Sequence, residues 1–206
     1  IFFTKMVSDS YLITGASGLL GSKVLEKLIS KKIIAKGIDK NLAKSHLRKN
    51  ISKCDILDSN KLKKLLPKYE NIIHLAAENS RAKYKQNRQR SHLINVKGSE
   101  NILKHLNNRK KFFFFSSCQV YDEFSKKIIT EKTNTNTKDY YGKSKIKTEN
   151  YIKKYSKKIG FNYCILRIFY VFGEKQDKEF LIPTLINKWL KNKKIDIWDG
   201  NGFRDL

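Results

Sequence analysis

Along the chain, short apolar runs alternate with longer segments in which apolar residues recur at the spacing of a helix. The short runs predict strands at residues 11–14, 32–38, 71–77, 111–117, 163–169 and 194–198. The longer segments predict helices at residues 19–30, 59–66, 92–108, 140–158 and 179–191. Because continuous apolar strands suit a sheet that is covered on both faces, this alternation predicts an α/β fold with a doubly wound parallel sheet.

Three glycines, Gly15, Gly18 and Gly21, lie between the first predicted strand and the first predicted helix. At such a junction one glycine permits a tight turn, a second lets the backbone approach a pyrophosphate, and a third lets helix and sheet pack closely. The free N–H groups at the helix N-terminus would stabilise the phosphate charge. The spacing G-x-x-G-x-x-G differs from G-x-G-x-x-G, so a dinucleotide site is predicted with a purely structural turn as the alternative.

A carboxylate, Asp39, ends the second predicted strand. A carboxylate at this place can accept hydrogen bonds from an adenosine ribose and would repel a 2′-phosphate, which favours NAD over NADP. The neighbouring Lys40 could accommodate that phosphate, so NADP stays the alternative. Asp55 follows a presumed third strand and is a candidate either to reach the adenine or to cap its own loop.

The chain is strongly basic, because 44 Lys and Arg residues against 19 Asp and Glu residues give a net charge of +25. Such a surface attracts polyanions, nucleic acids included. The lysines are spread along the chain rather than gathered in one tail, which favours a solvated basic surface over a dedicated nucleic-acid site. The same charge suits anionic small molecules such as nucleotides.

The three cysteines, Cys54, Cys118 and Cys164, are widely spaced and form no pair with metal-ligand spacing, so no metal site is expected. Their odd number and wide spacing fit a reduced, cytoplasmic setting. No apolar run approaches the roughly 20 residues of a membrane span, so no membrane partner is expected.

The stretch KDYYGKSKIKTEN, residues 138–150, opens a predicted helix. Residues four apart on a helix share a face, so Tyr141 and Lys145 can point together into a site. A tyrosine is a poor base near neutral pH, and a nearby lysine cation favours its phenolate. Tyr140 has only Ser144 at this spacing. The pattern therefore predicts Tyr141 as an acid/base, against the alternative of a tyrosine that packs beside an exposed lysine.

A series of motifs carries a family resemblance, in the family's order and at about its spacings. They are TGASGLLG (14–21), Asp39, Asp55, HLAA (74–77), NVKGSENIL (95–103), SSCQVY (116–121), YGKSK (141–145), LRIFYVFG (166–173) and WDGNGFRDL (198–206). Over nearly its whole length the chain resembles the extended short-chain dehydrogenase/reductases, in particular their NAD-dependent nucleotide-sugar epimerase/dehydratase group.

The resemblance implies an NAD-binding Rossmann domain at residues 6–178 and the beginning of a smaller C-terminal substrate lobe at residues 179–206. The chain would then be a truncated piece of the family's fold. By the same resemblance NAD is the cofactor. Its expected contacts are Gly15, Ser17, Gly18, Leu19, Leu20, Asp39, Asp55, Ile56, Leu75, Ala76, Ala77, Asn95, Tyr141 and Lys145.

For catalysis the resemblance implies transient hydride transfer at a site formed by Ser117, Tyr141 and Lys145. Tyr141 would take a proton from a sugar hydroxyl, and Lys145 would also hold the nicotinamide ribose. The hydroxyl of Ser117 would bind the reacting oxygen. Ser116 is expected to bond the backbone at the strand end, and His74 to shape the strand end beneath the cofactor.

The expected substrate-binding residues are Ser117, Cys118, Gln119, Tyr170 and Arg204. Cys118 and Gln119 stand where the sugar dehydratases of the family carry an acidic pair, which disfavours 4,6-dehydration. Tyr170 stands where the family usually has asparagine, which leaves the identity of the substrate open. Arg204 matches the arginine that binds substrate phosphate in the family.

The resemblance therefore predicts an NAD-dependent epimerase-type oxidoreductase that acts on a nucleotide sugar. An NADPH-dependent reductase of keto-sugars or other carbonyl compounds is the alternative in the same fold, and Asp39 argues against it. An RNA-binding protein on this scaffold is an alternative of another class, supported only by the net charge. The family often pairs through helices that include the one carrying Tyr141, so a homodimer is one expected assembly. Asn95 is expected either to support the site's hydrogen bonds or to pack its helix.

Overall fold

A computed structural model describes residues 9–42, 46–79, 86–121, 128–174, 176, 178 and 180–195. The chain divides into two compact units, Ile1–Arg167 and Ile168–Leu206. The first unit holds nearly all of the sheet and every element of the candidate site described below. The family-based domain limits, 6–178 and 179–206, stay a prediction.

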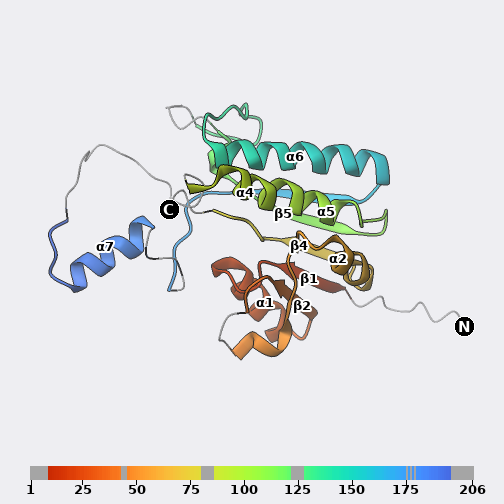
Figure 1. The fold of residues 1–206 in the computed structure, drawn as a ribbon, viewed down its shortest axis with the longest axis horizontal. Helices are drawn as coiled ribbons and strands as arrows, with labels where there is room; N and C mark the ends of the chain where they lie inside the picture. Colours follow the sequence, from red (N-terminus) through yellow and green to blue (C-terminus); the bar gives the residue numbers. More distant parts are fainter. Residues whose placement is uncertain are drawn as a thin grey trace, which may run out of the picture. The chain divides into compact units, whose positions relative to one another are not determined.

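The sheet has six strands in the order β3-β2-β1-β4-β5-β6, which lie side by side (Figure 1). Their bounds are β1 Ser10–Thr14, β2 Ile34–Asp39, β3 Ile51–Lys53, β4 Asn71–His74, β5 Lys111–Ser117 and β6 Asn162–Ile168. The pairs β1–β2, β1–β4, β2–β3 and β4–β5 are all parallel. The predicted doubly wound parallel sheet is therefore confirmed.

The helices connect these strands in sequence. Their bounds are α1 Leu19–Ser30, α2 Ser59–Leu65, α4 Arg88–His92, the π-helix η3 Leu93–Gly98, α5 Ser99–Leu103, α6 Tyr140–Ile159 and α7 Leu181–Leu190. Short 3₁₀ turns are η1 His46–Asn50, η2 Leu66–Lys68 and η4 Cys118–Val120. Within the first unit α5 and α6 lie side by side (Figure 1).

Several predicted limits were wrong. The helix predicted at 92–108 ends at Leu103, because the chain tightens there into three-residue turns, with the N–H of His105 bonded to the carbonyl of Ile102. The strand predicted at 71–77 ends at His74, since the N–H of Ala76 bonds to the hydroxyl of Thr14.

The predicted strand at 194–198 is not formed at its described residues, 194 and 195, and its remainder lies outside the described residues. The presumed strand before Asp55 is β3, which has only three residues and therefore carries no apolar run.

Apolar side chains point alternately to the two faces of the sheet along each strand, and a hydrophobic core forms on each face. Leu12, Ile72 and Phe112 belong to the core that includes residues of α2, α5 and α6. Their sequence neighbours Ile13 and Ile73 belong to the other core, which includes Leu25 of α1. Because successive strand residues point to opposite faces, both faces are apolar, as a covered parallel sheet requires.

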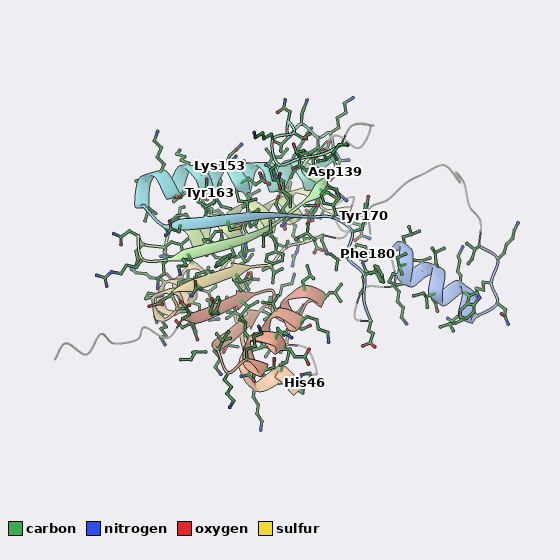
Figure 2. The ribbon with its side chains drawn as sticks, turned by 180° about the vertical axis from the view of Figure 1, so that it is seen from behind. His46, Asp139, Lys153, Tyr163, Tyr170 and Phe180 are labelled. Atoms are coloured by element: carbon green, nitrogen blue, oxygen red, sulfur yellow. The ribbon has the colours of Figure 1, made fainter. Side chains whose placement is uncertain are left out.

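Caps set the limits of α6. The Asp139 carboxylate accepts a hydrogen bond from the N–H of Gly142 at 2.9 Å and caps the first turn. Gly160 ends the helix with a left-handed φ of +89°. Figure 2 shows Asp139 at the end of the sheet where the parallel strands have their carboxyl ends. Ligands of such sheets bind at that end, so α6 begins where a site is expected.

Candidate active site

The glycine loop after β1 is packed too closely for side chains at two positions. Gly15 has a left-handed φ of +70°, and a Cβ there would lie 2.7 Å from the backbone nitrogen of Ala76. A Cβ on Gly21 would lie 2.1 Å from the carbonyl oxygen of Gly15. The first glycine thus permits the turn and the third permits helix α1 to pack on the loop, which are the roles predicted from their spacing.

The N-terminus of α1 differs from that of other helices in the first unit. Its cap residue, Gly18, supplies no side-chain hydrogen bond. By contrast, α2 and α6 are capped by the carboxylates of Asp58 and Asp139. Since a helix N-terminus attracts negative charge through its N–H groups, α1 presents a place that fits a phosphate group.

Asp39 lies beside this loop at the carboxyl end of β2. Its two carboxylate oxygens accept hydrogen bonds from the backbone N–H groups of Ser17 and Asn41, both at 3.0 Å. The hydroxyl of Ser17 donates in turn to the carbonyl of Asn41 at 2.8 Å. The structure therefore brings Ser17 and Asp39 together beside the glycine loop, and the contact of Asp39 with a ribose stays a prediction.

Asp55 caps its own turn, since its carboxylate accepts the N–H of Leu57 at 2.9 Å. This is the loop-cap alternative considered from the sequence. The next residue, Ile56, is buried against Gly98, where an added Cβ would lie 2.5 Å from the Ile56 side chain. Contacts of Asp55 and Ile56 with an adenine remain predictions.

His74 lies at the centre of a buried hydrogen-bond chain beneath the loop. Its Nδ1 lies 2.6 Å from the Thr14 hydroxyl and its Nε2 lies 2.8 Å from the Ser99 hydroxyl. Since Ser99 donates to the carbonyl of Asn95, its oxygen accepts from Nε2–H, and the Thr14 hydroxyl then donates to Nδ1. Burial, and then the charge of Lys145, lower the pKa of His74 to about 3, which favours the neutral ring. A role in shaping the strand end stays a prediction.

Thr14 also holds the backbone of the HLAA segment (74–77), whose residues 75–77 are predicted to contact the cofactor. Its carbonyl accepts the N–H of Leu75 at 3.2 Å, and its hydroxyl accepts the N–H of Ala76 at 3.2 Å. Ala77 follows directly and is half-buried. Leu19 and Leu20 are also half-buried and open helix α1. These positions therefore lie around the glycine loop, and their contacts with a cofactor remain predictions.

Asn95 belongs to the π-helix η3 and ties this loop to α6. Its side-chain oxygen accepts the N–H of Glu78 at 2.7 Å, and its amide donates to the Glu78 carbonyl at 3.0 Å. The same amide donates to the Ser144 hydroxyl at 3.3 Å. Because Ser144 stands between Tyr141 and Lys145 on α6, these bonds favour the network role over helix packing alone. π-Helical turns are often found at functional sites.

Tyr141 and Lys145 lie near each other at the N-terminal part of α6. The Lys145 ammonium lies 5.5 Å from the centre of the Tyr141 ring and 4.7 Å from that of Phe114. It donates a hydrogen bond to the carbonyl of Phe115 at 2.9 Å. Tyr140, in contrast, is half-exposed, and its ring lies 4.1 Å from the Arg88 guanidinium. The Lys143 ammonium lies 5.7 Å from the Tyr140 ring, but Lys143 is exposed whereas Lys145 is buried. The choice of Tyr141 over Tyr140 as the acid/base stays a prediction.

Burial lowers the pKa of Lys145 to about 7, with the negative charge of Glu149 acting in the opposite direction. Replacing Lys145 with methionine should therefore change how stability depends on pH. The folded pKa lies below the unfolded value of about 10.4, so the unfolded chain binds more protons between them. The wild type gains stability there as the pH rises, and a chain without this lysine lacks that gain.

Denaturant unfolding of Lys145→Met and wild type across this pH range measures the effect. The free-energy difference should favour the variant most below about pH 7 and shrink as the pH rises toward 10. Lys147→Met, on an exposed position of the same helix, controls for the loss of surface charge. A difference that does not change with pH would contradict a buried ammonium at Lys145.

Ser117 ends β5, and Cys118 and Gln119 open the 3₁₀ turn η4 that follows it directly. The hydroxyl of Ser117 accepts the N–H of Gln119 at 3.2 Å. The side-chain oxygen of Gln119 is buried and accepts no hydrogen bond from any described residue. A Cβ on Gly142 would lie 2.1 Å from the Gln119 carbonyl. The absence of a side chain at Gly142 therefore lets α6 press Tyr141 close to the turn that follows Ser117.

Two further substrate residues were predicted, Tyr170 and Arg204. Tyr170 belongs to the second unit and is 36% exposed. Arg204, with the whole 198–206 motif, lies outside the described residues. Their roles remain predictions.

The sequence reasoning missed a buried carboxylate at Glu149, one helical turn after Lys145. Its ion pair with Arg167 has an Oε2–Nη2 distance of 2.8 Å. Glu149 continues the spacing of Tyr141 and Lys145 on the same helix face, and this spacing was the available signal.

Among the described ranges, no three His, Cys, Asp or Glu side chains gather as they would around a metal ion. No helix in the described part of the chain has the length and apolar character needed to cross a membrane.

Comparisons with known proteins agree with this arrangement. The family model of the NAD dependent epimerase/dehydratase family matches residues 11–206. A Methanocaldococcus jannaschii protein assigned as a UDP-glucose 4-epimerase is 34% identical in an alignment of 207 positions that covers 95% of this chain and 68% of that protein.

Solved structures are also similar. A UDP-N-acetylglucosamine 4-epimerase of Methanobrevibacter ruminantium, in complex with UDP-N-acetylmuramic acid, has a TM-score of 0.86 at 28% identity over 96% of this chain and 68% of its own. A UDP-glucuronic acid 4-epimerase of Bacillus cereus, in complex with UDP-glucuronic acid and NAD, has a TM-score of 0.79 at 26% identity over 89% of this chain and 64% of its own. This chain thus spans about two thirds of the length of these relatives. From its sheet, its glycine loop and these matches, the chain belongs to the NAD-dependent epimerase/dehydratase family.

Proposed function

We propose that this chain forms the cofactor-binding part of an NAD-dependent nucleotide-sugar epimerase, with Ser117, Tyr141 and Lys145 at its reactive centre. One observation carries the proposal: the buried Lys145 ammonium lies 5.5 Å from the Tyr141 ring. Both residues belong to α6, which begins at the carboxyl end of the sheet, the end that also carries the uncapped glycine loop.

The residues around the loop fit a dinucleotide. The N-terminus of α1 and the close-packed Gly15 and Gly21 would receive its pyrophosphate. Asp39 would accept hydrogen bonds from the adenosine ribose, and Lys145 would reach the nicotinamide ribose. When bound, NAD supplies an acceptor for a hydride from the substrate carbon.

The side chains of the site would then transfer the proton of the sugar hydroxyl. The Lys145 cation would favour the phenolate form of Tyr141, which takes the proton from the sugar hydroxyl and becomes a neutral phenol. The Ser117 hydroxyl donates a hydrogen bond to the sugar oxygen as that oxygen becomes a carbonyl. The names of the relatives favour a UDP-sugar and inversion at its C4 carbon.

Incubation of the whole gene product with UDP-, GDP-, CDP- and dTDP-sugars, followed by NMR of the sugar, tests this function. Appearance of the epimer of one of these substrates is the expected result. Release of a stable keto-sugar would instead support a dehydrogenase that stops at the oxidised product, and no conversion of any of them would refute the epimerase proposal.

Asp39 should set the choice between NAD and NADP. Its carboxylate beside Ser17 would repel a 2′-phosphate, so the wild type should bind NAD at least about tenfold more tightly than NADP. Asp39→Asn removes that charge and should bring the affinities for NAD and NADP closer together. Calorimetric titration with both dinucleotides measures these affinities, with Lys40→Ala as the control that removes the neighbouring cation. Tighter binding of NADP by the wild type would contradict this role.

A further inference from the structure

Glu149 is a buried carboxylate that the proposed reaction does not use. Only 2% of this residue is exposed. It stands one turn after Lys145 and two turns after Tyr141 on α6, so the three side chains form a row on one face of the helix. That row lies against the end of β5.

The row on α6 meets consecutive residues of β5. Lys145 donates to the carbonyl of Phe115 at 2.9 Å. The Ser116 hydroxyl donates to the Glu149 carboxylate at 2.6 Å. The next residue along the strand is Ser117. Two hydrogen bonds therefore join α6 to the two residues that come immediately before Ser117.

Arg167 of β6 completes the arrangement. Its Nε and Nη2 atoms lie 3.2 Å and 2.8 Å from the two oxygens of Glu149, which makes the ion pair bidentate. Its Nη1 donates to the Tyr121 hydroxyl at 2.8 Å, and that hydroxyl donates to the carbonyl of Thr130 at 3.2 Å. Hydrogen bonds therefore hold the chain both just before Ser117, at residues 115 and 116, and four residues after it, at Tyr121.

A buried ion pair of this kind needs an explanation other than stability. The cost of removing two charges from water usually offsets their attraction, and well-packed apolar residues would stabilise the fold as well. What apolar residues do not supply is directed hydrogen bonding, which fixes positions to within a few tenths of an ångström. Here the directed bonds surround the strand end that carries Ser117.

We propose that Glu149 is a positioning residue, which through Ser116 and Arg167 holds the strand end carrying Ser117 at a fixed distance from Tyr141 and Lys145. The inference rests on the proposed function of these three residues. Glu149 touches no reacting atom in this account. It acts by keeping the hydroxyl of Ser117 and the phenol of Tyr141 aligned on the same sugar oxygen.

Glu149 also affects the charge of Lys145. The charged or titratable groups that face this lysine are Tyr141 and Glu149 on α6 and His74 on β4, with Arg167 of β6 paired to Glu149. His74 is neutral, so Glu149 is the nearby anion that favours the ammonium. Glu149→Gln keeps the shape but removes this attraction. Loss of the proton from Lys145 would remove the cation beside Tyr141, so the rate of the reaction should decline at high pH. In Glu149→Gln this decline should begin at a lower pH than in the wild type.

Ser116→Ala tests the positioning directly, because it removes one hydrogen bond and leaves the ion pair. A small misalignment of reacting groups should lower kcat by about tenfold to a hundredfold. The KM of the sugar, the Kd of NAD and the Tm should stay close to wild type. Ser156→Ala, which removes a hydroxyl that bonds to the Phe161 carbonyl at the far end of α6, is the matched control and should leave kcat unchanged.

Amide hydrogen exchange gives a readout that needs no activity. In Ser116→Ala, exchange should become faster over residues 115–121 and stay unchanged around Ser156. Unchanged exchange over 115–121 would overturn the positioning role, as would an unchanged kcat or a kcat that falls only in proportion to NAD affinity and Tm. An unshifted pH profile in Glu149→Gln would overturn the effect on Lys145. If the wild type converts no nucleotide sugar, the proposed function fails, and the exchange measurement still decides whether Glu149 and Ser116 hold the strand end.

Discussion

Replacing Tyr141 with phenylalanine should lower turnover by about three orders of magnitude while leaving NAD bound. General acid–base groups contribute on the order of 10² to 10⁴ to a rate, and phenylalanine removes only the group that exchanges the proton. The ring would still pack near Lys145, 5.5 Å from its ammonium. The measurement is kcat for epimerisation together with a calorimetric Kd for NAD, each compared with wild type.

Tyr140→Phe is the matched control, since it changes the neighbouring residue in the same way. Tyr140 is 50% exposed and its ring contacts the cations of Arg88 and Lys143. A phenylalanine ring keeps both contacts, so turnover should stay within about twofold of wild type. Equal losses in the two variants, or a loss confined to Tyr140→Phe, would contradict the assignment of Tyr141 as the acid/base.

Gly21→Ala should abolish NAD binding, with an affinity loss of about a hundredfold or more. The added Cβ would lie 2.1 Å from the Gly15 carbonyl, and backbone atoms on both sides leave no flexible side chain to yield. Alanine ordinarily stabilises a helix interior relative to glycine by about 1 kcal/mol. Here overpacking should reverse the sign and destabilise the fold by about 1–3 kcal/mol. Calorimetry with NAD and urea unfolding measure the two effects.

Gly160→Ala separates loss of binding from loss of stability. Gly160 has a φ of +89° at the C-terminus of α6, so alanine should destabilise the protein there through backbone strain. It lies far from the loop in sequence and should bind NAD as the wild type does. NAD affinity that survives Gly21→Ala would show that the close-packed loop does not receive the dinucleotide.

Local sequence patterns predicted the fold well where an element has one apolar face or a clear cap. The helix predicted at 19–30 is formed at those residues, and α6 ends one residue beyond its predicted limit, at Ile159. Asp139 begins α6 by capping its first turn, and Gly160 ends it with a left-handed φ. Both effects depend on the residue type at one position, so they can be predicted from the sequence. The π-helix at Leu93–Gly98 could not be predicted, because no local periodicity distinguishes it from an α-helix.

In the candidate site, contacts between residues on one helix could be predicted from their spacing in the sequence. Contacts between residues on different elements could not. Tyr141 and Lys145 could be paired because four residues separate them on a helix. The bonds of His74 with Thr14 and Ser99, and of Glu149 with Arg167, join residues on different elements. Such partners become neighbours only when the strands take the order that the structure gives them. Asp55 shows the opposite case, since a local bond to Leu57 was already an alternative in the sequence.

The central claim is that this glycine loop and the Tyr141–Lys145 pair serve a nicotinamide dinucleotide. Mass spectrometry of the nucleotide released from the whole gene product, as purified and after incubation with NAD, tests it most directly. We expect stoichiometric NAD in wild type and in Tyr141→Phe, and its loss in Gly21→Ala. A wild-type protein that neither carries nor takes up a dinucleotide would contradict it.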